Sequence, residues 1–487
     1  MAIIMLISAL AGCAAKNGDE DMTTTTESTT AKITDDSSFK LSFTQADSLD
    51  PFEAEAQNNQ VLASLVFESL FDLDEAYQVV PNIAKSYEYE DDTTIHIELN
   101  DGIVFSNGEA LTADDVVYSV NAALDSPAYG SLLTGISSAS AHENSVDINL
   151  SYPNPYAVNL LTFPISAEYD DDGFPIGSGR YHYENIDGTT VLKANKQDGF
   201  NPYITTITLV NIAASDSIDN AINIGNISYC YRDLSADISK RISSAKKLVN
   251  INNLVFIGIN GKYGITADEH IRRAVSLAAD RTTLTDSAYS GYATPALSPF
   301  NPYFTDTSGV SIFSKTADTA AAKQEVAESG IAESKLSLSL LVYKGNEAKV
   351  AMATLLKSEL EAAGFSVKID EEYYKSYMSK IADGQYDIYI GEVKLSDDMC
   401  LYPILSESGN ASYGIDFDSL ECAERYEAYM AGDEEFGGFM LAFSEEMPFV
   451  PLLYRKGMIC YSKAMSGDMQ GYYGNFFSNI ENWNFGT

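Results

Sequence analysis

Between residues 336 and 390 the chain alternates strand-like and helix-like segments, and this pattern restricts the possible fold more than any other feature of the sequence. Short apolar runs occupy residues 336–342, 366–369 and 386–390. The segments between them, residues 346–363 and 374–381, repeat apolar side chains at helical spacing, which is typical of amphipathic helices. Strands that alternate with helices form a mostly parallel sheet covered by helices. The sequence therefore predicts an α/β fold.

Further regular elements are predicted on both sides of this region. Alternating or continuous apolar patterns predict strands at residues 39–43, 94–99, 145–150, 253–260 and 448–454. Helical spacing predicts helices at residues 58–70 and 271–278, and Thr112 with Asp115 resembles a capping box that opens another helix. Since one apolar strand leads into the α/β region and another returns much later, we expect a second lobe that the chain enters once and leaves once.

The N-terminus is typical of a bacterial lipoprotein signal peptide. Residues 3–10 are apolar but too few to span a bilayer, which needs about 20 residues. They run into Leu10-Ala11-Gly12-Cys13, the signature of a lipobox, in which the thiol takes a diacylglyceryl group and becomes the new N-terminus. We assign residues 1–13 to the signal peptide, with Cys13 as the lipidation site. The expected location is the outer face of the cytoplasmic membrane, within the periplasm where the cell has an outer membrane.

Residues 14–38 are predicted to be a disordered tether. They are rich in Thr and acidic residues and carry almost no apolar side chains, so they cannot bury enough surface to offset the entropy of ordering. A flexible coil of this length would hold the folded part roughly 28 Å from the membrane on average.

The charge of the chain excludes several classes of partner. Thirty basic and 70 acidic residues give a formal net charge of −40. Binding to nucleic acid requires clustered Lys and Arg to displace counterions, and adhesion to anionic lipid requires the same sign of charge. We therefore expect neither nucleic acid binding nor electrostatic binding to a membrane.

Cysteine and histidine spacing predicts no metal site and no cofactor. The other cysteines, Cys230, Cys400, Cys422 and Cys460, are too widely spaced for a metal motif or a disulfide-rich scaffold. Cys230 is expected to be a buried thiol, and a Cys400–Cys422 bridge stays open as an alternative in an oxidising compartment. The histidines, at positions 96, 142, 182 and 270, form no paired-ligand spacing.

Seven segments, in order along the chain, carry a resemblance to one protein family. They are residues 49–51 (LDP), 66–70 (VFESL), 81–88 (PNIAKSYE), 99–116 (LNDGIVFSNGEALTADDV), 177–181 (GSGRY), 271–281 (IRRAVSLAADR) and 384–389 (GQYDIY). The longest of them resembles the pattern L.dgv.FsdGeplTAdDV, and GSGRY resembles GTGPY with Arg180 in place of the usual Pro. The chain thus resembles the extracellular solute-binding proteins of ABC importers, family 5, the group that includes oligopeptide- and dipeptide-binding proteins.

The resemblance implies a two-lobed, periplasmic-binding-protein-like fold of type II with a two-strand hinge. Lobe I would comprise residues 39–57, 166–257 and 461–487, with a subdomain inserted at residues 58–165. Lobe II would span residues 258–460. The lobes would close over a ligand, as hinged binding proteins do. The implied partners are the ligand and an ABC permease with its ATPase subunits, and we expect a monomer.

The resemblance also implies which segments line the cleft. In lobe I it indicates residues 55–57, where Glu55 and Gln57 are candidates, and an extended ligand could pair with this backbone as an added strand. The alternative is that these polar residues only begin a surface helix. Aromatic candidates for the cleft wall are Phe256 beside the hinge strand and Tyr472 with Tyr473 near the C-terminus.

In lobe II the resemblance indicates the segment after strand 386–390, at the carboxyl end of a strand where α/β sheets present ligands. The candidates there are Glu392, Val393, Lys394, Ser396, Asp397 and Asp398. In many peptide binders of the family an Asp in this loop, after a GW pair, holds the peptide's ammonium group. Here Glu392 stands in place of the Trp, and Leu395 or Ser396 falls near the expected Asp position. Asp397 and Asp398 are the candidates that could substitute for that Asp. Glu392 and Lys394 are expected to face one side, paired with each other or with the ends of a zwitterion.

These observations favour a receptor that captures a small solute, with a short peptide as the leading candidate, over an enzyme. The sequence has no GxSxG, no HExxH and no plausible Cys–His pair, so no catalytic residue is assigned. An oligosaccharide receptor and a sensor of a peptide signal stay open, because both aromatic and charged candidates occur. An extracellular hydrolase with a carboxylate dyad is the least favoured alternative.

Overall fold

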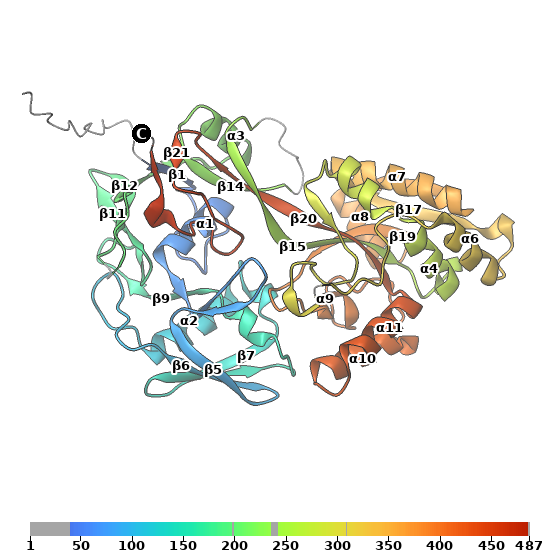
Figure 1. Ribbon diagram of the computed structural model, residues 1–487, viewed down its shortest axis with the longest axis horizontal. Coiled ribbons are helices and arrows are strands. Elements are labelled where there is room, and N and C mark those ends of the chain that lie inside the picture. The colour runs from blue at the N-terminus through green and yellow to red at the C-terminus, as the bar shows by residue number, and fades with distance from the viewer. Residues whose placement is uncertain (1–38, 197–198, 235–241, 308, 486–487) are drawn as a thin grey trace, which may run out of the picture. The chain divides into compact units, whose positions relative to one another are not determined.

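The structure is a computed structural model that describes residues 39–196, 199–234, 242–307 and 309–485 (Figure 1). Cys13 and residues 14–38 lie outside the described residues, so the lipidation site and the tether stay predictions. Among the described residues, no helix combines the length and the apolar character that crossing a membrane requires.

The largest sheet has the strand order β14-β20-β15-β19-β17-β18, with β16 paired to β20. Its strands are β14 (Tyr229–Asp233), β15 (Ala245–Ile259), β16 (Ala293–Pro295), β17 (Ser337–Tyr343), β18 (Ser366–Glu372), β19 (Ile388–Lys394) and β20 (Phe449–Tyr461). Only β17 pairs in parallel, with β18 and β19, and every other pairing in this sheet is antiparallel. The expectation of a mostly parallel sheet is therefore wrong. The predicted β-α-β-α-β run builds one end of the sheet, and the long returning strand reverses direction beside β15.

Strands β15 and β20 are much longer than their sequence patterns indicated. They pair with each other over nearly their whole length, with register shifts near Asn250 and Phe256. Figure 1 shows them side by side, running from the elements around β1 and β14 to those around β17 and β19. The polar residues Lys246, Lys247 and Asn250 interrupt the apolar pattern of β15, which is why the sequence indicated only its second half.

Hydrophobic clusters divide the described residues into three main bodies. One core contains β1, α1 and the first half of β15, and we call this body lobe I. A second core contains residues of the β5–β8 sheet and forms the subdomain. The third contains the second half of β15, the first half of β20 and the parallel strands, and we call it lobe II. Core membership changes along β15 between Ile251 and Leu254. We place the change of lobe there; the sequence-based domain boundaries stay a prediction.

Lobe I is built on the sheet β1-β13-β12-β11. Its strands are β1 (Phe39–Phe43), β11 (Tyr181–Ile186), β12 (Thr189–Ala194) and β13 (Thr206–Asn211). The short strands β21 (Met465–Ser466) and β22 (Asn484–Phe485) also pair here. Helices α1 (Gln57–Val66) and α3 (Ser215–Asn223) belong to this part of the chain. A small sheet of β2 (Glu68–Ser69), β9 (Pro164–Tyr169) and β10 (Pro175–Gly177) adjoins the subdomain, because Ile165 of β9 belongs to the subdomain core. Strand β1 has the predicted bounds.

Helix α1 ends earlier than predicted, at Val66, because the chain turns extended at Phe67 and enters β2. The glycines of GSGRY lie against this helix end. A Cβ on Gly177 would come within 2.0 Å of the Val66 carbonyl oxygen, and the Gly179 amide donates to that oxygen at 2.9 Å. Only glycine permits this approach. The contact fixes Glu68 and Arg180 on either side of the junction.

The subdomain consists of the sheet β5-β6-β8-β7, covered by helix α2 (Ala113–Asp125), and the hairpin of β3 (Phe71–Leu73) and β4 (Val79–Pro81). The four sheet strands are β5 (Ala84–Asp91), β6 (Thr94–Leu99), β7 (Ile136–Ala141) and β8 (Ser145–Leu150). Strands β6 and β8 have the predicted bounds. The capping box is also confirmed, since Thr112 and Asp115 satisfy each other's backbone amides.

Helices α7 (Glu347–Ala363) and α8 (Tyr374–Ala382) of lobe II pack on the parallel strands β17 and β18. The other helices of lobe II are α4 (Glu269–Ala278), α5 (Arg281–Thr283), α6 (Thr319–Glu328), α9 (Tyr402–Leu405), α10 (Glu421–Met430) and α11 (Phe436–Glu446). Gly364 ends α7 at φ 110°, as predicted, because this left-handed conformation favours glycine. Cys400 and Cys422 are both free, buried thiols, so the alternative of a bridge between them is wrong.

Candidate functional site

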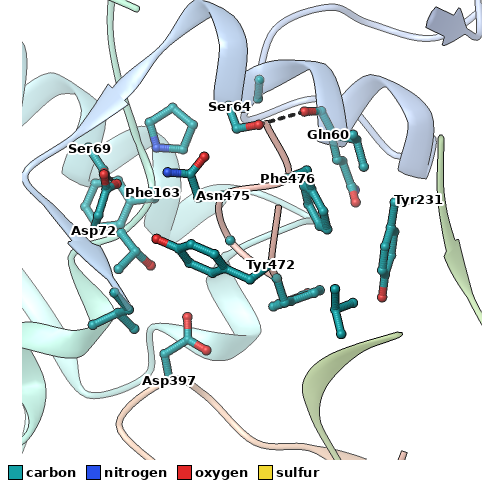
Figure 2. A pocket seen from close by; sticks show the side chains of 18 of the residues that line it. Gln60, Ser64, Ser69, Asp72, Phe163, Tyr231, Asp397, Tyr472, Asn475 and Phe476 are labelled. Atoms are coloured by element: carbon teal, nitrogen blue, oxygen red, sulfur yellow. Dashed lines mark hydrogen bonds between the residues drawn. The ribbon is translucent and has the colours of Figure 1, made fainter. Parts of the chain in front are cut away.

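A cavity of about 510 Å³ lies where lobe I, the subdomain and the segment after β19 meet. Helix α1 and the β2–β3 segment supply one wall, and the first half of β15 supplies another. Residues 394–397 and the C-terminal segment 472–476 close the remaining sides. Figure 2 shows Asp72, Asp397, Tyr231 and Tyr472 among the side chains that surround this space. The volume is in the range of cavities that hold small ligands.

Two carboxylates on the wall formed by the β2–β3 segment are partly shielded from water. Burial raises the pKa of Glu68, although Ser178 donates a hydrogen bond to it at 2.9 Å. Burial also raises the pKa of Asp72, which accepts from the Ser69 hydroxyl at 3.1 Å. A cationic ligand group would therefore find poorly compensated negative charge on this wall.

Three cationic side chains line the same cavity. Arg180 donates to the Phe477 carbonyl at 3.0 Å, and burial lowers its pKa. Lys247 on β15 reaches Glu75 and the Gln470 carbonyl, each at 3.1 Å. Lys394 lies at the end of β19, and all three line the space that Asp397 enters. The cavity thus presents both signs of charge to one ligand.

Asp397 follows β19 and is held in place by amide side chains. Leu395 is fully buried, and its amide continues the β15 pairing by donating to the Asn252 carbonyl at 2.9 Å. The Asn252 side chain donates to Asp397 Oδ1 at 2.9 Å, and Asn159 donates to the Asp397 carbonyl at 3.3 Å.

The carboxyl group of Asp397 has a raised pKa. Burial raises its pKa to about 6, and neighbouring Asp398 adds to the rise, while Lys394 and Asn252 oppose it. A cation placed beside it would favour the ionised form and lower this pKa. Asp397 is therefore suited to accept a cationic group from a ligand.

Aromatic rings form a further side of the cavity. Tyr231 contacts Phe476 at 4.7 Å between ring centroids and Tyr473 at 6.0 Å. The Lys394 ammonium lies 5.3 Å from the Tyr473 ring centroid, within the range of a cation–π contact. Burial alone would lower the pKa of Lys394, but Tyr473, Asp397 and Asp233 raise it. Lys394 therefore stays charged.

Six of the predicted site residues line this cavity, and five do not. The six are Gln57, Lys394, Ser396, Asp397, Tyr472 and Tyr473. The other five are Glu55, Phe256, Glu392, Val393 and Asp398. Glu55 is exposed, with its amide directed to Asp47 at 3.3 Å, and Val393 packs against the lobe II core. Only some residues of each predicted segment therefore line the cavity.

Phe256 is not a wall of the cavity. Its side chain is 1% exposed and packs between Tyr389 at 5.9 Å and Phe449 at 5.6 Å, within the lobe II core. The prediction was wrong because Phe256 lies in the second half of β15, beyond the change of lobe.

Glu392 is directed away from the cavity into a buried ion network. Its carboxylate contacts Arg455 Nε at 2.7 Å and Lys349 Nζ at 2.8 Å, and Arg455 also contacts Asp233 at 2.7 Å. Burial would raise the pKa of Glu392, but Lys349 and Arg455 outweigh it and hold the pKa at about 2. The expected pairing with Lys394 is therefore wrong, because the Glu392 carboxylate already contacts Lys349 and Arg455.

Asp398 joins the subdomain to lobe II instead of facing a ligand. It is 2% exposed and accepts from Asn154 Nδ2 at 2.7 Å and from the Cys400 amide at 3.1 Å. Nearby, the hydroxyls of Tyr156 and Tyr429 hydrogen-bond at 2.7 Å. We call these two contacts the seam. Of the two aspartates considered for ammonium binding, only Asp397 lines the cavity.

Several cavity residues carry little or no signal in the sequence. Arg180 was noted only as a departure from the expected Pro. Lys247 lies in the half of β15 that no apolar pattern indicated, and Asp72 lies in the short hairpin strand β3. Tyr231 is one of 31 tyrosines, so its residue type alone does not indicate a place in the site. A charged residue that interrupts an otherwise strand-like pattern, as Lys247 does, is the one signal that was available.

Comparison with known proteins decides the family. The model of the bacterial extracellular solute-binding proteins, family 5, matches residues 78–412, more than half of the chain. This chain belongs to that family. The family and the relatives below are substrate-binding proteins and not enzymes, which confirms the sequence-based expectation.

Two curated relatives show how far the similarity extends. The chain is 26% identical over 318 residues to the nickel-binding protein NikA of Staphylococcus aureus (strain NCTC 8325 / PS 47), covering 62% of this chain and 64% of that protein. It is 24% identical over 421 residues to the periplasmic murein peptide-binding protein MppA of Escherichia coli (strain K12), covering 75% and 77%. The chain thus spans a little under two thirds of NikA and about three quarters of MppA.

Structural comparison establishes the fold of this family 5 protein. An ABC transporter substrate-binding protein from Sinorhizobium meliloti superposes with a TM-score of 0.75 at 18% identity, covering 92% of this chain and 100% of that one. The predicted two-lobed, periplasmic-binding-protein-like fold is confirmed.

Proposed function

We propose that this family 5 protein is an extracellular receptor that captures a short peptide in the cavity and delivers it to an ABC permease. The observation that carries the proposal is the pairing of Asp397, an under-compensated carboxyl, with the cations Arg180, Lys247 and Lys394 around one small cavity. A peptide with free termini carries an ammonium and a carboxylate, and therefore matches both signs of charge. Asp397 would accept the ammonium group.

We expect capture to proceed by closure of the two lobes about the hinge strands β15 and β20, with the seam formed in the closed arrangement. Strands β15 and β20 are the long connections shared by the two lobes, and Asn154 of the subdomain meets Asp398 of lobe II. Ligand contacts to both sides would favour the closed arrangement over an open one. The closed form would then engage the permease and its ATPase subunits as a monomer, anchored through a lipid on Cys13 and the tether 14–38.

Relatives of the chain are named for peptide and for nickel binding, and the cavity chemistry favours peptide. Among the described residues that line the cavity there is no His and no Cys, the side chains whose nitrogen and sulfur atoms suit nickel. The backbone amide groups of a peptide would instead find hydrogen-bond donors and acceptors on Gln57, Ser396 and Asn475. Aromatic rings such as Tyr472 keep an oligosaccharide as the second candidate, since they offer faces on which sugar rings can pack.

A thermal-shift screen of the full chain tests the proposal. The probes are short peptides, cello- and malto-oligosaccharides, and nickel chelates. A ligand at 100 times its Kd that binds only the folded state adds about 2.7 kcal/mol of stability. Stabilisation by peptides alone supports the proposal. Stabilisation by sugars or nickel chelates with peptides silent would overturn the ligand while leaving the family unchanged.

A further inference from the structure

Two of the four histidines, scattered in the sequence, come together on the outer face of the subdomain sheet. His96 Nδ1 on β6 lies 2.6 Å from Asp147 Oδ1 on β8. His142 Nε2, just after β7, lies 2.7 Å from the other oxygen of the same carboxylate. Glu90 on β5 adds a second carboxylate, since ligand atoms of Glu90, His96 and Asp147 all lie within 4.8 Å of one another. These four residues form the histidine cluster.

The sheet fixes the two central members of this cluster. His96 and Asp147 are direct partners in the β6–β8 register. Their neighbours Ile95, Ile97 and Val146 are fully buried on the opposite face, so the pleat directs His96 and Asp147 outward. Ligands mounted on paired strands keep their spacing better than ligands on loops. The side chains of His96 and Asp147 are 26% and 20% exposed, which leaves the cluster accessible to an ion.

The surrounding charge favours a cation. The carboxylates of Asp147, Glu90 and Glu88 all lie around His96. Glu88 is the β5 partner of His96 in the register. A second group of metal-ligating type, His270 with Glu325 and Glu328, differs in this respect. There the Arg273 guanidinium contacts His270 Nδ1 at 2.8 Å and Glu325 at 3.1 Å, so a cation already neutralises it.

We propose that His96, Asp147 and Glu90 bind a zinc ion, and that the exposed side chain of His142 turns from Asp147 to complete the ligand set. Two imidazole nitrogens with carboxylate oxygens make a ligand set that Zn²⁺ accepts and that the oxygen-seeking Ca²⁺ and Mg²⁺ do not prefer. The ion takes the place of the hydrogen-bonded proton on each ring nitrogen, which leaves Asp147 free to turn from the imidazoles to the metal. This site lies on the subdomain sheet and contributes no residue to the ligand cavity, so it is independent of the proposed peptide binding.

Calorimetric titration of Zn²⁺ into the full chain tests the site, with Co²⁺ as a spectroscopic probe of ligand nitrogen. We expect one zinc ion per chain, at least about tenfold weaker binding in His96→Gln or His142→Gln, and no measurable binding in the double variant. The matched control is His270→Gln, which should bind zinc as the wild type does. Unchanged zinc stoichiometry and affinity in the double variant, loss of binding in the control, or no zinc binding by the wild type would each overturn the proposal. Urea unfolding of each variant identifies any loss that comes from misfolding, and in that case His96→Asn and His142→Asn replace the Gln variants.

Discussion

Glu392 and Asp397 belong to one short stretch of chain, yet their environments differ sharply. Glu392 is buried with two cations in contact, and its pKa falls to about 2. Asp397 has an amide partner and one cation nearby, and its pKa rises to about 6. Burial opposes the charge of both, so the difference lies in the number and closeness of the cations. A carboxylate whose charge is fully compensated holds the lobes' shared strands together, whereas one that lacks compensation is available to a ligand.

The largest expected effect is a loss of stability when the structural carboxylate, Glu392, is substituted. Glu392→Gln removes the partner of Lys349 and Arg455, and Arg455 is only 2% exposed. Breaking a buried pair in this way costs about 3–5 kcal/mol. Urea denaturation at pH 7 should show a fall of about that size in the free energy of unfolding. The control is Lys85→Gln, at an exposed pair with Glu98, where about 0–1 kcal/mol is expected.

The same substitution has a defined pH dependence. Because the pKa of Glu392 is lowered from 4.5 to about 2 by its partners in the folded state, its stabilising contribution is present above pH 4.5 and is lost as the pH falls toward 2. The stability difference between wild type and Glu392→Gln should shrink through that window. A difference below 1 kcal/mol at pH 7 would contradict the view that this network is structural.

Asp397→Asn should act on binding and not on stability. The amide keeps the oxygen that accepts from Asn252, but it carries no charge for a ligand ammonium. Losing a charged hydrogen bond costs about 1.5–3 kcal/mol, which corresponds to peptide binding weaker by about 10- to 100-fold. Calorimetry with a tripeptide measures this loss. Unfolding at pH 7 should be no easier than in the wild type, because the variant removes an under-compensated buried charge.

Peptide affinity should also depend on pH through Asp397. With a pKa of about 6 in the free protein, the carboxyl is mostly protonated at pH 5 and mostly ionised at pH 7. If the bound ammonium requires the ionised form, affinity falls by about tenfold from pH 7 to pH 5. In the ligand-free protein the sign for stability is the opposite: the raised pKa makes folding less favourable as the pH rises from 3.8 to 6. Asp397→Asn should remove the pH dependence of both the peptide affinity and the stability. If the variant kept these pH dependences, the titrating group would be Glu68 or Asp72 instead.

The smallest expected effect concerns the aromatic side of the cavity. Tyr473→Leu removes the ring beside the Lys394 ammonium, a contact of about 0.5–1 kcal/mol. Peptide affinity should fall by about two- to fivefold. Tyr374→Leu, at an exposed ring of lobe II, is the control and should leave affinity unchanged. A loss of a hundredfold or more in Tyr473→Leu would indicate that ring stacking, and therefore a sugar-like ligand, dominates recognition.

The elements of the fold were largely predictable because their signals are local. The capping box at Thr112, Gly364 at the end of α7 and the apolar spacing of α4 and α8 need no information beyond a few neighbouring residues. The first half of β15 escaped because Lys247 and Asn250 face the cavity and break its apolar pattern. Residues that serve a site replace the apolar residues by which a strand is recognised.

The site was only partly predictable because it depends on long-range partners. Nothing near Glu392 in the sequence indicates Lys349 or Arg455, and these two cations decide that Glu392 is structural. Asp397 and Asp398 are adjacent and chemically identical, and only the positions of Asn252 and Asn154 separate their roles. In the same way, His96 and His142 meet only through the register of β6, β7 and β8.

Titration calorimetry of one tripeptide and its N-acetylated form into wild type and Asp397→Asn, at pH 7, tests the central claim most directly. The account predicts that the wild type prefers the free tripeptide by at least about tenfold, since acetylation removes the ammonium that Asp397 would accept. The variant should bind both forms equally and weakly. Equal affinity of the wild type for both forms, or an unchanged preference in the variant, would contradict the assignment of Asp397 as the ligand's ammonium acceptor.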